Sequence, residues 1–219
     1  MLYEELTNNL AEIKKNIELS CIKAGKNPDS VKILAATKGQ PVEKINSVIA
    51  NGIKICGENY VKEAENKINE IGNRAEWHFI GHLQSNKVKK AVEIFDCIQT
   101  LDSVKLAKKI DDIAEKPFPV LIEVNIGKEK NKFGIKPEGV FSFYDSLNEF
   151  HNLNIKGLFC MAPFVPAEQA RKYFQLMKQL NSKLCLSELS MGMSNDYFVA
   201  IEEDSSMIRI GTALFGERK

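Results

Sequence analysis

A lysine stands where the first short apolar run of the chain gives way to a helix. Residues 31–37 are apolar and partly β-branched, which is typical of a buried strand and too short for a helix. Lys38 follows directly, and Gly39 and Pro41 then end the strand before a helical pattern begins. In α/β proteins this edge of the strands binds ligands, and a lysine amine that is desolvated there is a nucleophile toward carbonyls. Most lysines at strand ends are solvated, so a role for Lys38 depends on the rest of the chain.

An arginine lies inside an apolar strand pattern near the end of the chain. Strand alternation places Arg209 on the same face as Met207 and Gly211, with isoleucines on the other face. A buried guanidinium without a partner costs several kcal/mol, so Arg209 requires a carboxylate or a ligand. Gly211 and Thr212 leave the following backbone open to an anion.

Three more segments place polar side chains after strand patterns. Ser194, in LSMGMSND, precedes a helix, and a capping serine beside free backbone N–H groups can bind phosphate. Asn59, in GENY, offers a donor and an acceptor, with a helix N-cap as an equal alternative. His82, in WHFIGHLQSNK, is a candidate base, although a lone histidine is more often structural, and Ser85 after it is a candidate helix cap.

The elements that must position these residues alternate along the chain. An amphipathic helix ends near Gly25 and is followed by strand patterns at 31–37, 53–56, 77–80, 95–99, 119–125, 155–161, 188–191 and 207–210. Helix patterns lie between them at 42–50, 60–71, 85–91, 103–115, 138–150, 166–184 and 195–201. No hairpin signal joins the strands, because the one Asn-Gly pair follows a helix and is typical of its cap. The pattern predicts an α/β fold, a single (β/α)8 TIM-type barrel whose N-terminal helix covers the outside.

Composition bounds the protein class. The chain has 219 residues, 44% hydrophobic and 27% charged, without a flexible linker, which predicts one domain over residues 1–219. Thirty basic against 29 acidic residues leave a formal net charge of +1, so no global field favours nucleic acid or a membrane surface. The basic string NKVKK is then expected to be a solvated helix face.

The five cysteines are odd in number and never spaced as C-x-x-C. Since most lie in apolar runs, we expect reduced core residues in a cytoplasmic protein and no metal site. The N-terminus lacks the pattern of a signal peptide, and no segment approaches the ~18 apolar residues of a membrane span.

One lysine, two anion-binding segments and one buried arginine suit a phosphorylated carbonyl compound. A sugar phosphate and pyridoxal phosphate both qualify on these residues alone. The strings TKGQPVEKI, GENYVKEAENK, WHFIGHLQSNKVKKAV, VNIGKEKNKFGI, IKGLFCMAP and SMGMSNDYFVAI…MIRIGTALFGER occur in this order. They closely resemble the pyridoxal phosphate homeostasis protein family, also described as the proline synthetase co-transcribed homologue, over roughly residues 2–218.

The resemblance implies the fold of the alanine racemase N-terminal domain, a fold type III barrel. It implies that Lys38 forms a Schiff base with the cofactor and that Arg209 faces the pyridine nitrogen. Asn59 resembles the residue beside the ring, and the positions that match the phosphate site are Ser194, Gly211 and Thr212. The one departure is Asp204, which stands at an expected helix end where the family pattern leads us to expect glycine.

An arginine keeps the pyridine nitrogen unprotonated, which weakens the ring as an electron sink. Racemases of this fold type add a tyrosine from a C-terminal β-domain of the partner subunit, and this chain ends at Lys219 without such a domain. The resemblance therefore implies a non-catalytic carrier in vitamin B6 homeostasis that delivers pyridoxal phosphate to apo-enzymes through transient contacts, as a monomer or weak homodimer.

Three alternatives remain at this point. The first is a low-activity amino-acid racemase using Lys38 as one base and His82 or Tyr60 as the other. The second is a cofactor-free sugar-phosphate isomerase. The third is an RNA-binding protein acting through NKVKK, which the near-neutral charge disfavours.

Overall fold

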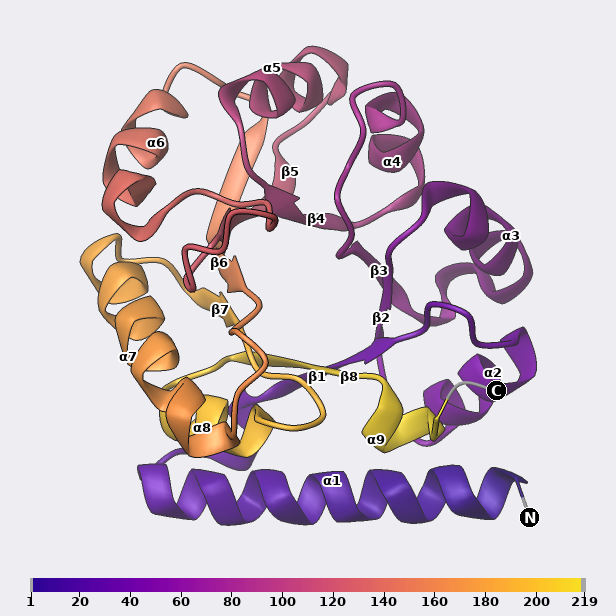
Figure 1. Cartoon of the computed structure of the whole chain (residues 1–219). Coiled ribbons are helices and arrows are strands. Elements are labelled where there is room, and N and C mark those ends of the chain that lie inside the picture. Colours follow the sequence, from indigo (N-terminus) through magenta and orange to yellow (C-terminus); the bar gives the residue numbers. More distant parts are fainter. Residues whose placement is uncertain (1, 218–219) are drawn as a thin grey trace.

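The computed structural model describes residues 2–217, with side chains from residue 4 onward, and places eight parallel strands in one closed barrel (Figure 1). Strands follow one another around the barrel in chain order, and the eighth pairs with the first. The strands are β1 (Lys32–Ala36), β2 (Ile55–Glu58), β3 (Glu76–Phe79), β4 (Cys97–Leu101), β5 (Phe118–Val124), β6 (Leu153–Cys160), β7 (Glu188–Ser190) and β8 (Met207–Ile210). All eight predicted strands are present, so the predicted barrel is confirmed.

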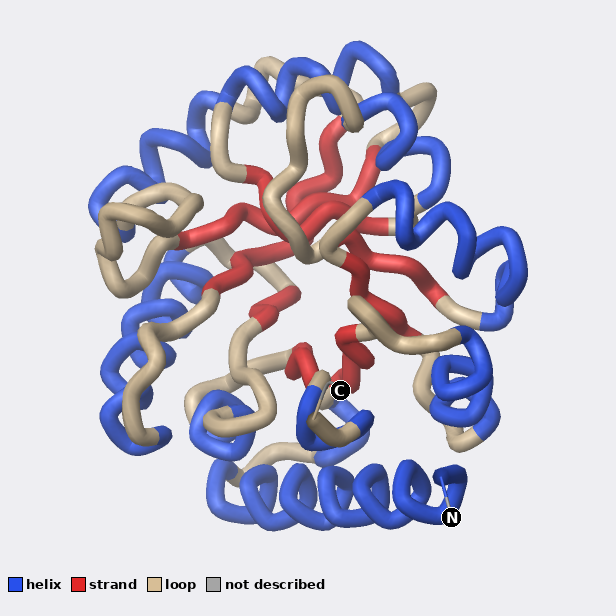
Figure 2. The backbone as a smooth tube through the Cα atoms, turned by 45° about the vertical axis from the view of Figure 1, so that its right-hand side comes forward, coloured by secondary structure: helices blue, strands red, loops and turns tan. Residues whose placement is uncertain are grey.

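The helices form the outer layer around the strands (Figure 2). They are α1 (Leu2–Ala24), α2 (Val42–Ala50), α3 (Val61–Ile71), α4 (Val88–Ile94), α5 (Val104–Ile113), α6 (Val140–Ser146), α7 (Ala167–Lys183), α8 (Tyr197–Glu202) and α9 (Thr212–Phe215). Short 3-10 turns occur at Pro28–Ser30, Gly72–Arg74 and Pro137–Gly139. The four-residue α9 was not predicted, since one helical turn carries no periodicity. The predicted cap Ser85 is wrong, because residues 84–87 form a turn and α4 begins only at Val88, with Lys87 as its N-cap.

Helix α1 closes the outside of the barrel where β8 meets β1 (Figure 1). Its stripe of Leu6, Leu10, Ile13 and Ile17 is buried against the outward side chains of both strands. Asn9 adds a polar tie, because its side-chain amide donates to the Leu214 carbonyl at 3.1 Å. The N-terminal helix thus covers the outside, as expected, beside the short helices α8 and α9.

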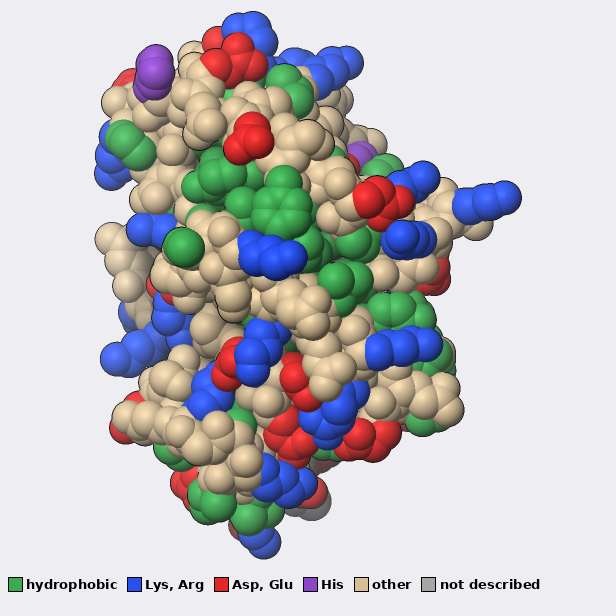
Figure 3. All heavy atoms as spheres, turned by 90° about the vertical axis from the view of Figure 1, so that its left-hand side faces the viewer, with side chains coloured by type: hydrophobic (Ala, Val, Ile, Leu, Met, Phe, Trp, Pro, Cys, Tyr) green, Lys and Arg blue, Asp and Glu red, His purple; other side chains and the backbone are tan. Residues whose placement is uncertain are grey.

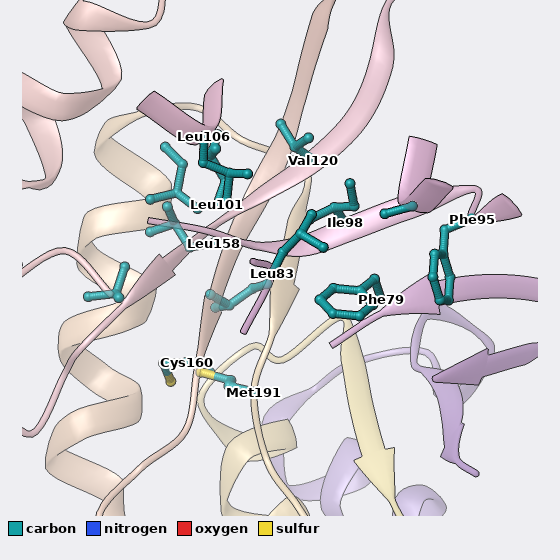
Figure 4. Packing of buried hydrophobic residues seen from close by; sticks show 14 of the residues in the cluster. Phe79, Leu83, Phe95, Ile98, Leu101, Leu106, Val120, Leu158, Cys160 and Met191 are labelled. Carbon is teal, nitrogen blue, oxygen red and sulfur yellow. The ribbon is translucent and has the colours of Figure 1, made fainter. Parts of the chain in front are cut away.

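The larger core lies between the other strands and their helices. Figure 4 shows leucines and phenylalanines from β3, β4, β6 and neighbouring segments meeting there, and Phe79 packs edge-to-face on Phe95 with ring centroids 5.3 Å apart. Helix α7 contributes Ala170, Phe174 and Met177, which are fully buried on its inner face. Because this core is closely packed, it fixes the positions of the strand ends.

On the face formed by α6, α7 and α8, charges of both signs are intermixed in the lower half and hydrophobic side chains gather above them (Figure 3). The mixture reflects ion pairs such as those of Arg171 with Glu168, Glu202 and Glu203. No extended region of one sign covers this face, as the net charge predicts. None of the helices within residues 2–217 is long and apolar enough to span a membrane.

Four of the cysteines are buried, but Cys185 is exposed, so the expectation of core cysteines holds only for the other four. Cys185 follows the end of α7 with φ 53°, the left-handed region. Asp204, after the end of α8, has φ 69°, which explains why glycine was expected there. Asp204 is held by ion pairs with Lys26 at 3.4 Å and Lys178 at 2.6 Å.

We expect Cys185→Gly to stabilise the protein by about 1 kcal/mol, because glycine adopts the left-handed conformation without strain. The side chain is exposed, so little packing is lost. Chemical denaturation of the two proteins measures the difference. Cys185→Ala removes the thiol but keeps the strain, so an equal gain in that variant would contradict the argument.

Candidate functional site

The six predicted site residues lie on one arc of the barrel, at the carboxyl ends of strands. Asn59, Lys38 and Arg209 come from β2, β1 and β8 or the loops directly after them, and these strands are neighbours. Gly211 and Thr212 follow β8, and Ser194 lies in the loop after β7. The barrel therefore brings together residues that are up to 174 positions apart, from 38 to 212, at a single edge.

Lys38 lies in the turn that follows β1, at the carboxyl end of the barrel. Leu34 and Ala36 belong to the interior cluster, whereas Ala35 packs outward against α1. Lys38 is two residues beyond Ala36, half-buried, and its Nζ lies 4.9 Å from the centroid of the Tyr60 ring. The amine is thus at the mouth of the barrel and close to an aromatic face.

A buried ionic cluster holds the residues on both sides of Lys38. Lys67, on α3, uses its three ammonium hydrogens on the Thr37 carbonyl, on Glu58 Oε1 and on Glu63 Oε1, at 2.7, 2.6 and 2.7 Å. The Thr37 hydroxyl also donates to Glu58, at 2.6 Å. The Gly39 N–H donates to Glu63, at 2.6 Å. We name Lys67, Glu58 and Glu63 the Lys67 cluster.

The charges of the Lys67 cluster are set by burial and mutual pairing. Glu58 is fully buried, which raises the pKa of its carboxyl, although hydrogen bonds from Lys67 and Thr37 oppose this. Burial also acts to raise the pKa of Glu63, but bonds from Lys67 and Gly39 outweigh it and the pKa is lowered. The cluster therefore contains an ammonium whose loss would leave a buried carboxylate unpaired.

Arg209 is buried in β8 and points into the barrel, as the alternation predicts. It donates to Ser190 Oγ at 2.9 Å and to the Cys160 carbonyl at 2.6 Å, and its guanidinium lies 4.1 Å from the Phe159 ring centroid. Burial lowers its pKa to about 10, which still leaves it cationic at neutral pH. Within residues 4–217 no carboxylate forms an ion pair with Arg209. Its partners are instead the Ser190 hydroxyl and the Cys160 carbonyl, and in the predicted site a ligand would be a further partner.

Ser194 is not the predicted helix cap, because α8 begins at Tyr197 with Asp196 as its N-cap. Its Oγ instead accepts a hydrogen bond from the Ala213 N–H, at 3.1 Å. This bond ties the loop after β7 to α9 and leaves the Ser194 hydroxyl hydrogen available to an anion. Gly211 lies beside the end of β1, since a Cβ built on it would be 3.6 Å from that of Ala36.

Asn59 is not a helix cap either, because Tyr60 is the N-cap of α3. Asn59 is half-buried and follows Glu58 at an inward position of the alternation. His82 stacks on Phe133, with ring centroids 3.5 Å apart, and its Nδ1 is 3.6 Å from Asp102. The stack joins the loops after β3 and β5 across the mouth.

Glu123, on β5, is a buried carboxyl that sequence reasoning missed. Its side chain is inward-facing by alternation with Leu121, and its Oε2 has no hydrogen-bond partner. Burial, together with the charge of Asp102, raises its pKa to about 7, while the charge of Arg209 acts to lower it. Its signal in the sequence is one acid inside the apolar run VLIEV.

The other functional candidates that were missed share the same kind of signal. Each is a polar residue within an apolar strand pattern, or a charged pair on the helix that follows one. Two signals in the sequence indicate the Lys67 cluster. One is Glu58 at the end of the apolar run ICGE, and the other is the spacing of four residues between Glu63 and Lys67 in EAENK. The inward polar residues of β3, β4 and β7 are His78, Gln99 and Ser190.

Cavities of about 670 and 260 Å3 lie at the opposite end of the barrel, around the starts of the strands. Both include Lys32 and Glu76 and mix basic with acidic side chains, and neither includes a predicted site residue. Among the described residues, no group of three or more His, Cys, Asp or Glu side chains could hold a metal ion.

Comparison with known proteins adds independent findings. The family model described as "Alanine racemase, N-terminal domain" matches residues 8–219. A pyridoxal phosphate homeostasis protein of Aquifex aeolicus is 38% identical, with 96% of this chain and 97% of that protein covered. The structure of PipY of Synechococcus elongatus with PLP bound has a TM-score of 0.83 at 32% identity, covering 96% of this chain and 100% of PipY.

More distant structures share the fold alone. An alanine racemase of Clostridium difficile has a TM-score of 0.74 at 17% identity, and 98% of this chain covers 56% of that one. The barrel, the full-length relatives and the family model agree with one another. The chain therefore belongs to the pyridoxal phosphate homeostasis protein family, within the larger family of alanine racemase N-terminal domains.

Proposed function

We propose that this protein binds pyridoxal 5'-phosphate in intracellular cofactor homeostasis, holds it as a Schiff base on Lys38 and delivers it to apo-enzymes. The observation that carries the proposal is the placement of Lys38 directly after β1 and of Arg209 on the adjacent β8, with the loop of Ser194 bonded to the segment after β8. The names of the relatives and the PLP bound in PipY support it.

The chemistry of the donors fits this cofactor. Pyridoxal phosphate supplies an aldehyde, which an amine such as that of Lys38 attacks. Its phosphate would take the free hydroxyl hydrogen of Ser194 and the backbone of Gly211 and Thr212, where α9 begins. Arg209 has five N–H donors, of which two have protein acceptors, so it retains donors for the ring nitrogen.

The same residues favour a carrier over an efficient enzyme. An arginine at the ring nitrogen cannot give up a proton and disfavours carbanion chemistry. His82 is engaged by Phe133 and Asp102. We therefore propose a single barrel domain that acts in the cytoplasm and makes transient contacts with apo-enzymes, without nucleic acid or membrane partners. The alternative, a low-activity racemase, is favoured by one observation, the exposed Tyr60 ring beside the Lys38 amine.

Borohydride reduction with pyridoxal phosphate, followed by peptide mapping, tests the attachment site. We expect a pyridoxyl group on the peptide that contains Lys38 and on no other lysine at stoichiometric cofactor. Lys38→Ala should lose this label, whereas Lys44→Ala, at a helix lysine that binds the Phe215 carbonyl, should keep it. Labelling of other lysines in its place would overturn the assignment.

Turnover separates the two candidate functions with the same protein. Incubation of the loaded protein with several amino acids should give no racemisation near ordinary enzyme rates of about 1 s⁻¹ or more. The loaded protein should restore activity to an apo-enzyme that requires the cofactor. Fast racemisation that is lost in Lys38→Ala would establish the alternative.

A further inference from the structure

A chain of hydrogen bonds runs through the inside of the barrel from Arg209 toward its opposite mouth. Arg209 donates to Ser190 Oγ at 2.9 Å, and Ser190 donates to Gln99 Oε1 at 2.7 Å. Gln99 Nε2 lies 2.6 Å from His78 Nδ1. His78 Nε2 lies 2.8 Å from Glu76 Oε1, where the chain ends. We name these four bonds the barrel chain.

In the orientation that the structure gives the Gln99 amide, the barrel chain runs in one sense, from Arg209 to His78. An arginine only donates, so Ser190 Oγ accepts from it and turns its own hydrogen to Gln99. The Gln99 amide presents its oxygen to Ser190 and its NH₂ group to His78. A carboxylate only accepts, so the far ring nitrogen of His78 carries the hydrogen that Glu76 receives.

Burial makes each of these bonds matter. The side chains of Ser190 and Gln99 are fully buried and those of His78 and Arg209 nearly so. A buried polar group that loses its partner costs free energy, so each member constrains the orientation of the next. Only the Glu76 side chain, about half exposed, reaches solvent at the far mouth, where it lines the 260 Å3 cavity with His78.

We propose that Ser190, Gln99 and His78 act as one positioning unit that holds the guanidinium of Arg209 in a single orientation. The unit keeps His78 as the tautomer with its hydrogen on Nε2. It takes the place of a carboxylate partner, which Arg209 lacks among the described residues. The role of Arg209 toward the cofactor rests on the proposed function, whereas the sense of the barrel chain does not.

Nitrogen-15 NMR of the histidine rings tests the sense of the chain without any cofactor. The chain has three histidines, so single substitutions assign the signals. We expect the His78 signals of a ring with its hydrogen on Nε2 and an unprotonated Nδ1. In Gln99→Glu the new carboxylate still accepts from Ser190 but offers His78 an acceptor, so we expect Nδ1 to gain a proton. A wild-type ring that carries its hydrogen on Nδ1 would overturn the proposal.

Ser190→Ala tests the positioning itself, with Ser205→Ala as the matched control. Both serines are fully buried near β7 and β8, but Ser205 contacts only backbone carbonyls, at 2.8–3.2 Å. Ser190→Ala should weaken pyridoxal phosphate binding about ten-fold and shift the His78 ring signals. Ser205→Ala should lower stability but change neither readout.

The outcomes separate this inference from the proposed function. If the wild type binds pyridoxal phosphate and Ser190→Ala binds it equally well, the positioning role is wrong and the proposed function stands. If the wild type binds none, the proposed function fails. The positioning unit is then judged by the His78 signals alone, and their persistence in Ser190→Ala would reject it.

Discussion

Replacing Lys67 by methionine should lower the free energy of unfolding by about 3–5 kcal/mol, because it leaves the buried carboxylate of Glu58 without its cation. Both side chains are nearly inaccessible, at 8% and 0% exposure, so water cannot solvate the remaining charge. Methionine keeps most of the apolar length of lysine, which limits the effect of a cavity. Urea denaturation at neutral pH measures the loss. A loss below about 1 kcal/mol would contradict the proposed energetics.

The Lys90 to Glu65 pair is a matched control for this variant. Its N–O distance of 2.8 Å resembles those of Lys67, but both side chains are about 40% exposed. Solvent and salt screen such a pair, so Lys90→Met should have little measurable effect on unfolding. A large loss of stability in Lys67→Met but not in Lys90→Met would therefore identify burial of the ion pair as the cause.

A second substitution separates the effect of Lys67 on stability from its effect on the position of Lys38. Adding Glu58→Gln to Lys67→Met removes the unpaired charge and should recover much of the lost stability. It does not restore the bond from Lys67 to the Thr37 carbonyl beside the reactive lysine. We therefore expect the double variant to fold but to be labelled at Lys38 more slowly in the borohydride experiment. Labelling at the wild-type rate would show that the Lys67 cluster serves stability alone.

The barrel could be predicted because each strand repeats the same local signal. An apolar run, a break and a helical stripe recur seven times before an eighth apolar run, and parallel strands of this kind must be covered by helices on the outside. The inward position of Arg209 also followed from alternation alone. These features depend on the spacing of apolar residues within one segment, so they can be predicted without knowing which other segments it contacts.

The interior networks could not be predicted in the same way. The contact of Gln99 with Ser190 joins residues 91 positions apart, and their meeting depends on the register of two strands, β4 and β7, that are not neighbours in the barrel. Ser194 was expected to cap a helix, but its hydroxyl bonds to the Ala213 N–H on α9, an element too short to show in the sequence. Long-range register, rather than local propensity, decides such pairs.

Replacing Glu123 by glutamine should stabilise the protein at neutral and alkaline pH by roughly 3 kcal/mol, since burial raises the pKa of this carboxyl from 4.5 to about 7. The folded-state pKa lies above the unfolded one, so the protonated form favours folding. Its contribution is fully present below about pH 4.5 and is lost as the pH rises to about 7. Glutamine resembles the protonated acid at every pH and does not carry this penalty.

The measurement is the free energy of unfolding of both proteins from pH 4.5 to pH 8. The difference should be small at the acid end and grow until about pH 7, then stay constant. Glu115→Gln, at an exposed position, supplies the background effect of removing one acidic side chain. A difference between wild type and Glu123→Gln that is the same at pH 4.5 and pH 8 would mean that folding leaves the pKa of Glu123 unchanged, so that a partner offsets the effect of burial on its carboxylate. The unpartnered Oε2 argues against such a partner, as does the lack of any ion pair between Glu123 and Arg209 among the described residues, because a carboxylate paired with that guanidinium would titrate well below neutral pH.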